Sequence, residues 1–177
     1  WEDNQSGSIT QGASTISQQV IKNSHLTDDQ TMSRKLAEIM MAFQLEQVYT
    51  KDEILELYLN QVYFGKGAYG VGTAAMVYFG KDVSELNLSE SAALAGILKS
   101  PSNYAPHINM DQCIQRRNLV LSEMYENGFI TEDEYNAAKA AKLSIVDYDS
   151  SAYPYGFYTD MVQNDAFGPF GISYAYL

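Results

Sequence analysis

The chain has 177 residues, of which 46% are hydrophobic and 19% are charged. This composition is that of a folded globular protein with one domain or two small lobes, and it excludes extended disorder and a large multidomain architecture. The 22 acidic residues outnumber the 11 basic ones, so the formal net charge is −11. A nucleic-acid-binding surface needs a basic excess, and we therefore expect no nucleic-acid partner.

Several classes of protein are excluded by what the sequence lacks. The single cysteine, Cys113, forbids an internal disulfide and offers no metal cluster, so we expect a small, semi-buried apolar residue. No apolar run approaches the roughly 18 residues of a membrane-spanning helix, and residues 1–5 do not have the pattern of a signal peptide. His25 and His107 are expected in loops or at the surface. Nucleophile elbow, zinc-protease, P-loop and dinucleotide motifs are all missing.

The first part of the chain predicts three helices. A short helix follows the N-cap pair Ser14-Thr15 and ends near Asn23. Apolar residues then recur at the three- and four-residue steps of an amphipathic helix over residues 32–43. Residues 50–53 have the pattern of a capping box, which predicts a helix over residues 51–60.

We expect four further helices, over residues 71–79, 90–98, 111–127 and 132–142. A flexible glycine-rich turn precedes the first of them, and Gly80 ends it as a C-cap. Ser89 is expected to open the second, and Pro101 to stop it. Gly128 closes the third, and a second capping box at Thr131 opens the fourth.

The last segment, residues 144–177, has a different texture. It holds six of the 14 tyrosines, and proline and glycine residues interrupt any long period. This pattern indicates short strands or loops, with one turn of helix near residues 160–164. The fold class predicted from the pattern is therefore mainly α, with a short irregular Tyr-rich C-terminal tail.

A polar stripe runs along the first predicted helix. Ser14, Gln18 and Lys22 fall at positions i, i+4 and i+8, with Thr15 and Gln19 beside them. Most polar stripes are solvated helix faces. Hydroxyls and amides without an acidic residue are nevertheless hydrogen-bonding groups that suit an anionic or sugar ligand.

A basic group follows on the second predicted helix. Arg34 and Glu38 can pair along the helix, while Lys35 lies to one side, and an exposed pair of this kind contributes only about 0.3–0.5 kcal/mol. Together with Lys22, these cations make a local positive site in an acidic chain, which favours a phosphate-bearing ligand. Lys99 follows an apolar helix, where a cation also compensates the helix dipole.

Four segments in this order closely resemble motifs of the peptidoglycan glycosyltransferases, the chain-polymerising domain of class A penicillin-binding proteins and of monofunctional glycan polymerases. Residues 12–23 resemble the second motif of that family and residues 34–38 the third. Residues 51–60 resemble the fourth motif and residues 88–101 the fifth. Including shorter matches, the similarity covers residues 6–143.

The resemblance implies a lysozyme-like helical domain over residues 1–143, with residues 144–177 belonging to the same domain or beginning a linker. It implies an enzyme at the outer face of the bacterial cell membrane that joins lipid II into glycan strands. The acceptor hydroxyl would displace the polyprenyl pyrophosphate of the growing strand, with inversion to a β-1,4 link. The implied partners are lipid II, the growing strand, the membrane surface and phosphoglycolipid inhibitors.

The departing pyrophosphate accumulates negative charge, so the reaction needs positioned cations or a divalent metal such as Mg²⁺ or Mn²⁺, and a carboxylate that accepts the acceptor's proton. By similarity, Glu38 would be the second essential carboxylate, which orients the basic side chains or a metal. The residues that the resemblance assigns to sugar, phosphate and pyrophosphate binding are Ser14, Thr15, Gln18, Gln19, Lys22, Asn23, Arg34, Lys35 and Lys99.

One motif of the family has no counterpart in these residues. The family's first motif, Glu-Asp followed by Phe and His-Gly, carries the glutamate assigned as general base. Glu2 and Asp3 are followed by Asn4 and Gln5, without the Phe or the His. The resemblance therefore predicts a fragment that begins after the base and cannot polymerise lipid II, although its parent enzyme would.

Two alternatives remain open at this point. A lytic transglycosylase or lysozyme relative would share the helical fold but cleave glycan strands with a catalytic glutamate. A non-catalytic, acidic helical interaction module would explain the composition equally well, although not the polar cluster of the first helix.

Overall fold

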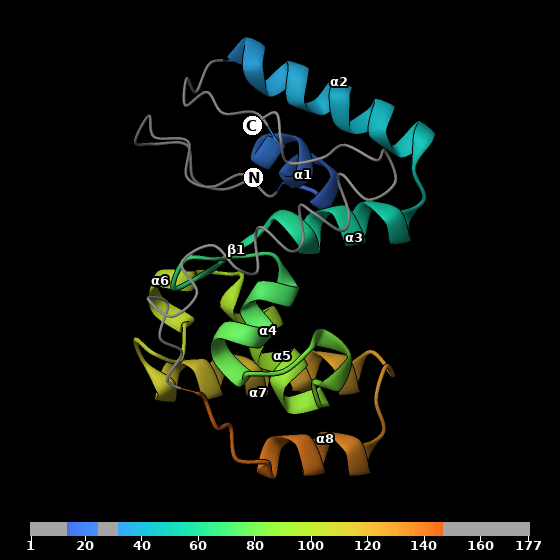
Figure 1. Ribbon diagram of the computed structural model, residues 1–177. Coiled ribbons are helices and arrows are strands. Elements are labelled where there is room, and N and C mark those ends of the chain that lie inside the picture. Colours follow the sequence, from blue (N-terminus) through green and yellow to red (C-terminus); the bar gives the residue numbers. More distant parts are fainter. Residues whose placement is uncertain (1–13, 25–31, 147–177) are drawn as a thin grey trace, which may run out of the picture. The chain divides into compact units, whose positions relative to one another are not determined.

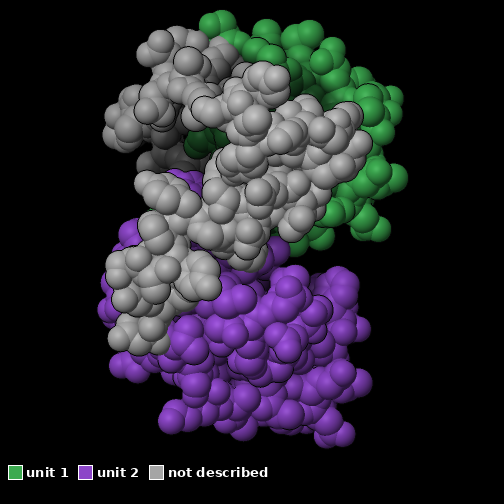
Figure 2. Space-filling model, viewed as in Figure 1, with its two compact units in different colours: residues 1–63 green, residues 64–177 purple. Residues whose placement is uncertain are grey.

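The computed structural model describes residues 14–24 and 32–146, and the statements below concern those residues. The chain divides into two compact units, residues 1–63 (unit 1) and residues 64–177 (unit 2), which Figure 2 shows in different colours. Apart from one two-stranded sheet, the elements described are helices, so the mainly α class is confirmed. The predictions for His25 and for the tail after Val146 lie outside the described residues.

Unit 1 contains three helices, α1 (Ile16–Ser24), α2 (Met32–Val48) and α3 (Lys51–Gln61) (Figure 1). Helix α1 packs against both α2 and α3. All three helices contribute to the core, whose buried apolar residues are Val20, Ala42, Ile54 and Tyr58. Burial of these side chains is the driving force that holds the three short helices together.

The predicted capping pattern of unit 1 is confirmed. Thr15 Oγ1 accepts a hydrogen bond from the Gln18 backbone N–H at 3.2 Å, and Gln18 Oε1 accepts from the Thr15 N–H at 3.3 Å. These two bonds make a capping box at the start of α1. Thr50 and Glu53 form the second box, at the start of α3.

The predicted glycine-rich turn is a small β-hairpin. Strand β1 (Tyr63–Gly65) pairs with β2 (Ala68–Tyr69) through a two-residue loop. Both loop residues have positive φ, 52° at Lys66 and 74° at Gly67, as a type I′ turn requires. For the lysine this left-handed backbone costs roughly 1–2 kcal/mol.

The remaining elements of unit 2 are α4 (Val71–Phe79), the 3₁₀ turn η1 (Val83–Glu85), α5 (Leu88–Ile97), α6 (Pro101–Tyr104), α7 (Met110–Glu126) and α8 (Glu132–Ala140) (Figure 1). The most extensive helix contact joins α5 to α7, and α8 covers both. Ala92, Leu121 and Ala138, one from each of these helices, form a buried cluster. A side chain at Gly96 would meet Arg116 Cγ at 3.0 Å, so glycine allows this close approach.

The predictions for both ends of α5 are wrong. The N-cap of α5 is Asn87, whose side chain accepts from the Glu90 N–H at 3.0 Å, and not Ser89. Pro101 does not stop α5, which ends at Ile97, but occupies the first position of α6. A proline is favourable there because the first helical N–H has no partner within the helix. The predicted cap at Gly80 and the box at Thr131 are confirmed.

The two buried charged residues Arg117 and Glu90 connect elements of unit 2. The Arg117 guanidinium is 2% exposed and donates to Ser89 Oγ at 3.0 Å and to the Ala141 carbonyl at 2.9 Å. It thus connects α7 with the start of α5 and the end of α8. Lys81 donates to both carboxylate oxygens of Glu90, at 2.7 and 3.0 Å.

Cys113 is buried in unit 2, and His107 packs against an aromatic ring. Cys113 is 1% exposed, and burial raises the pKa of its thiol to about 11, as expected for an unreactive apolar residue. His107 is exposed at the surface, as predicted, and its ring stacks on Tyr78 with centroids 5.8 Å apart. Partial burial, with the positive charge of Lys66, lowers the pKa of His107. Within the described ranges, no helix combines the length and apolarity needed to cross a membrane.

Candidate active site

The start of α1 meets the first turns of α2 at a cluster of three predicted site residues. Lys35 Nζ donates to Ser14 Oγ at 3.1 Å and to Glu38 Oε2 at 3.4 Å. The Lys35 side chain is 49% exposed, whereas that of Glu38 is only 13% exposed. The shielded Glu38 carboxylate thus orients the accessible Lys35 ammonium. Because Lys35 also donates to Ser14, it joins the segment that resembles the third motif to the one that resembles the second.

The placement of Lys35 on α2 differs from the predicted one, whereas the predicted Arg34–Glu38 pair is not tested by the described residues. Lys35 does not lie to one side but pairs with Glu38 itself at i, i+3, because residues three apart are neighbours on a helix surface. Arg34 belongs to α2 as well, but its side chain lies outside the described residues. The carboxylate of Glu38 therefore orients at least one of the two predicted cations.

The amides next to Ser14 support the first turn of α1. The capping box uses one lone pair of the Gln18 side-chain oxygen, so the amide N–H groups and the second lone pair are the remaining hydrogen-bonding capacity of that side chain. Gln19 Nε2 donates to the Ser14 carbonyl at 3.4 Å. Thr15 and both glutamines thus shape the backbone that carries the Ser14 hydroxyl.

The other predicted site residues lie further away in the elements. Lys22 and Asn23 are exposed near the end of α1, and Lys22 is about two turns from Ser14. Lys99 is exposed two residues after the end of α5, in unit 2. The roles of these residues in one common site stay predictions.

Sequence reasoning missed one polar contact beside this cluster. Ser17 Oγ donates to Glu46 Oε1 at 2.5 Å, and Ser17 is only 6% exposed. A signal for it existed, since Glu38, Ala42 and Glu46 follow one another at four-residue steps and so share one face of α2.

The described residues do not form a metal cage. They contain no group of three His, Cys, Asp or Glu side chains that could hold an ion. Mg²⁺ is often bound by one or two carboxylates together with substrate phosphates, but the Glu38 oxygen Oε2 already accepts from Lys35. The divalent cation that the resemblance implies stays a prediction.

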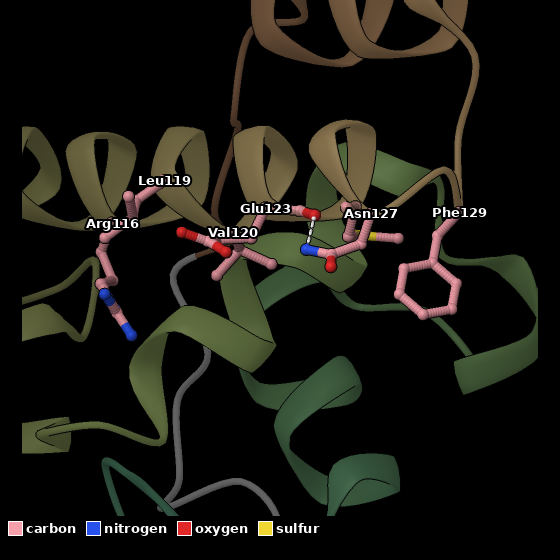
Figure 3. Close-up of a pocket in the computed structure, with 7 residues that line it drawn as sticks. Arg116, Leu119, Val120, Glu123, Asn127 and Phe129 are labelled. Atoms are coloured by element: carbon pink, nitrogen blue, oxygen red, sulfur yellow. Dashed lines mark hydrogen bonds between the residues drawn. The ribbon is translucent and has the colours of Figure 1, made fainter.

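A cavity of about 380 Å³ lies in unit 2, on α7 and the turn that follows it (Figure 3). Its lining residues are Arg116, Leu119, Val120, Glu123, Met124, Asn127 and Phe129. Asn127 Nδ2 donates to the Glu123 carbonyl at 2.7 Å along its rim. The cavity is mainly apolar and contains none of the predicted site residues.

The family described as Transglycosylase matches residues 1–125, which is more than half of the chain. The chain therefore belongs to the transglycosylase family. This match includes the capping box of α1, the Lys35–Glu38 pair and the helix α3 that supports them.

The relatives found in the comparison are penicillin-binding proteins. Penicillin-binding protein 1A of Escherichia coli is 43% identical over 170 residues, which cover 95% of this chain and 20% of the relative. Penicillin-binding protein 1A of Aquifex aeolicus is 44% identical over 165 residues, covering 93% of this chain and 23% of the relative. The chain thus spans about a fifth of the length of these relatives.

A solved structure shows the same fold. The crystal structure of penicillin-binding protein 1A from Haemophilus influenzae aligns with a TM-score of 0.53 and 38% identity, over 71% of this chain and 18% of that one. The lysozyme-like helical class that the resemblance predicted is confirmed by this likeness.

Proposed function

We propose that this chain is the glycosyl-transfer domain of a peptidoglycan polymerase, which joins lipid II to a growing glycan strand and releases polyprenyl pyrophosphate. The observation that carries the proposal is the Ser14–Lys35–Glu38 cluster, which brings residues of two family motifs into hydrogen-bonding contact. Family membership supports the same assignment.

The cluster suits a pyrophosphate leaving group. When the bond from the anomeric carbon to pyrophosphate breaks, negative charge grows on the departing oxygen, and a fixed cation stabilises that charge without reorganising. Lys35 offers an ammonium that Glu38 and Ser14 hold in place while half of its side chain stays accessible. Lys22, Arg34 and Lys99 would add charge along the ligand.

The remaining steps follow from the balance of the reaction. The acceptor hydroxyl oxygen forms a bond to the anomeric carbon on the face opposite the pyrophosphate, so the configuration inverts. The bonding electrons of the broken bond leave with the pyrophosphate, and the hydroxyl proton passes to a general base. In the family this base belongs to the first motif, whereas Glu38 pairs with a cation and so acts on the leaving group.

The outer face of α2 supports work at a membrane surface. Leu36, Met40 and Phe43 recur at helical spacing and are 61%, 59% and 65% exposed. Met41, on the same helix, is 37% exposed. An apolar helix face of this kind can enter the acyl boundary of a bilayer, as a lipid-linked substrate requires. We place this contact at the outer face of the cell membrane.

The function is tested by polymerisation of lipid II in a polypeptide that joins this chain to the family's first motif. Replacing Glu38 with Gln should lower the rate about a hundredfold or more, because Lys35 loses the carboxylate that orients it. Lys22→Met should also abolish turnover, whereas Glu132→Gln, at an exposed glutamate of α8 outside the four family motifs, should not.

Two outcomes would contradict this assignment. If the folded variants Glu38→Gln and Lys22→Met polymerise lipid II at near-normal rates, the Ser14–Lys35–Glu38 cluster is not the active site. Release of soluble fragments from cell-wall sacculi would indicate a cleaving enzyme instead. We also expect no chain growth from the 177 residues alone, because they do not contain the first motif.

A further inference from the structure

The contact between Ser17 and Glu46 joins α1 to α2 at a second point. It lies about three turns along α2 from Lys35, which donates to Ser14 just before α1. Ser17 and Glu46 are 29 residues apart in the sequence, and the hydroxyl is almost fully enclosed. Neither residue has a role in the site described above.

The chemistry of this contact makes it strong. An O–H···O distance of 2.5 Å is typical of a hydroxyl that donates to an ionised carboxylate. Ser17 is 6% exposed but Glu46 is exposed at the surface, so the bond is part-buried, and a hydroxyl that loses this partner keeps part of the penalty of having left water. Removing the Glu46 carboxylate therefore favours a displacement of α1 that brings the Ser17 hydroxyl to a different hydrogen-bond acceptor.

The two contacts hold the start of α1 from both directions along α2. Ser14 and Ser17 are about one turn apart, whereas Lys35 and Glu46 are about three turns apart, so their long side chains converge on α1. Ala42 lies between them on the same face of α2 and is 4% exposed. Its small side chain permits the close approach of the two helices (Figure 1).

We propose that Glu46, acting through Ser17, is a positioning residue that sets the placement of α1 and thereby the meeting of Ser14 with Lys35. The inference rests on the proposed function. Because Ser14, Gln18 and Lys22 belong to one short helical segment, a shift or rotation of α1 moves the whole polar stripe relative to the Lys35–Glu38 pair. Displacement by about 1 Å is enough to reduce a rate a hundredfold.

The test uses Ser17→Ala and Glu46→Ala in the polypeptide that carries the first motif. The measurements are kcat and KM for lipid II, at a temperature where circular dichroism shows each variant fully folded. We expect kcat to fall about ten- to a hundredfold, with a much smaller change in KM. Ser17→Thr, which keeps the hydroxyl, should restore kcat. Glu132→Ala, at an exposed glutamate of α8 outside the four family motifs, should leave both constants unchanged.

The outcomes separate this inference from the proposed function. If the unmodified polypeptide neither polymerises lipid II nor binds farnesyl pyrophosphate, the proposed function fails. If it polymerises and both folded alanine variants keep its kcat, the positioning role is overturned and the contact serves stability alone. Where Glu46→Ala does not fold, Glu46→Gln keeps an acceptor oxygen without the charge. It should lower kcat, and an unchanged kcat would overturn the inference.

Discussion

The two units of the chain use their apolar residues differently. In unit 2, α5, α7 and α8 enclose a cluster around Leu121, which is 0% exposed, and a buried arginine fastens their ends. In unit 1, the three helices share a small core, while α2 leaves large apolar side chains such as Leu36 and Phe43 in solvent. Unit 2 also exposes large apolar residues, such as Phe129 at 78%, so the contrast lies in the row of Leu36, Met40 and Phe43 along one face of α2.

The largest expected effect is the loss of stability caused by a cavity in the core of unit 2. Leu121→Ala should lower the free energy of unfolding by about 2–5 kcal/mol, because it leaves a cavity among closely packed helices. Urea unfolding followed by circular dichroism measures the change. The matched control is Leu36→Ala on α2, which should change stability by about 0.5 kcal/mol or less. Equal losses in the two variants would remove the contrast between the units.

A moderate effect concerns the membrane and not stability. The double variant Leu36→Ser, Phe43→Ser should weaken binding of the chain to vesicles of anionic phospholipid, since it removes apolar area from the exposed face of α2. Flotation with the vesicles measures the bound fraction. Phe129→Ser changes an equally exposed aromatic residue of unit 2 and should have no effect. If the unit 2 variant loses binding instead, the assignment of the membrane face to α2 is wrong.

The smallest expected effect compares one helix cap in each unit. The Thr50 N–H and hydroxyl donate to Glu53 at 2.7 and 2.8 Å, and these bonds lower the pKa of Glu53 below its ordinary value of 4.5. The Thr131 cap lowers the pKa of Glu134 in the same way. A carboxyl whose pKa is lower in the folded state contributes stability above its unfolded pKa, and this contribution is lost as the pH falls through the folded pKa.

Thermal unfolding of Glu53→Gln and Glu134→Gln between pH 6 and pH 3 checks this expectation. Each variant should lose less stability on acidification than the unmodified chain, because it has one fewer carboxylate to protonate. An unchanged acid dependence in both variants would mean that the caps do not contribute in this way.

The sequence predicted those parts of the fold that depend on neighbouring residues. The boxes at Thr50 and Thr131 and the left-handed cap at Gly80 involve residues at most four positions apart. The start of α5 was misplaced because Ser89 and Asn87 are both good N-caps. The buried bond from Arg117 makes Ser89 part of the core, and the choice between the two depended on that distant partner.

The sequence predicted which residues belong to the candidate site, but not which of them contact one another. Helical spacing placed Ser14, Lys35 and Glu38 on two helices, and the family motifs indicated a common ligand. Spacing alone favoured an Arg34–Glu38 pair and put Lys35 to one side, whereas Lys35 contacts Glu38 here. The bond between Ser17 and Glu46 depends on how α1 lies on α2, which no local pattern encodes.

The central claim is tested most directly by calorimetric titration of farnesyl pyrophosphate into this chain and into its variants. We predict saturable binding that becomes about tenfold weaker or more in Lys35→Met, because one charge-assisted hydrogen bond is lost. Lys142→Met, at an exposed lysine outside the four family motifs, should bind like the unmodified chain. Equal affinity of Lys35→Met and the unmodified chain would contradict the account.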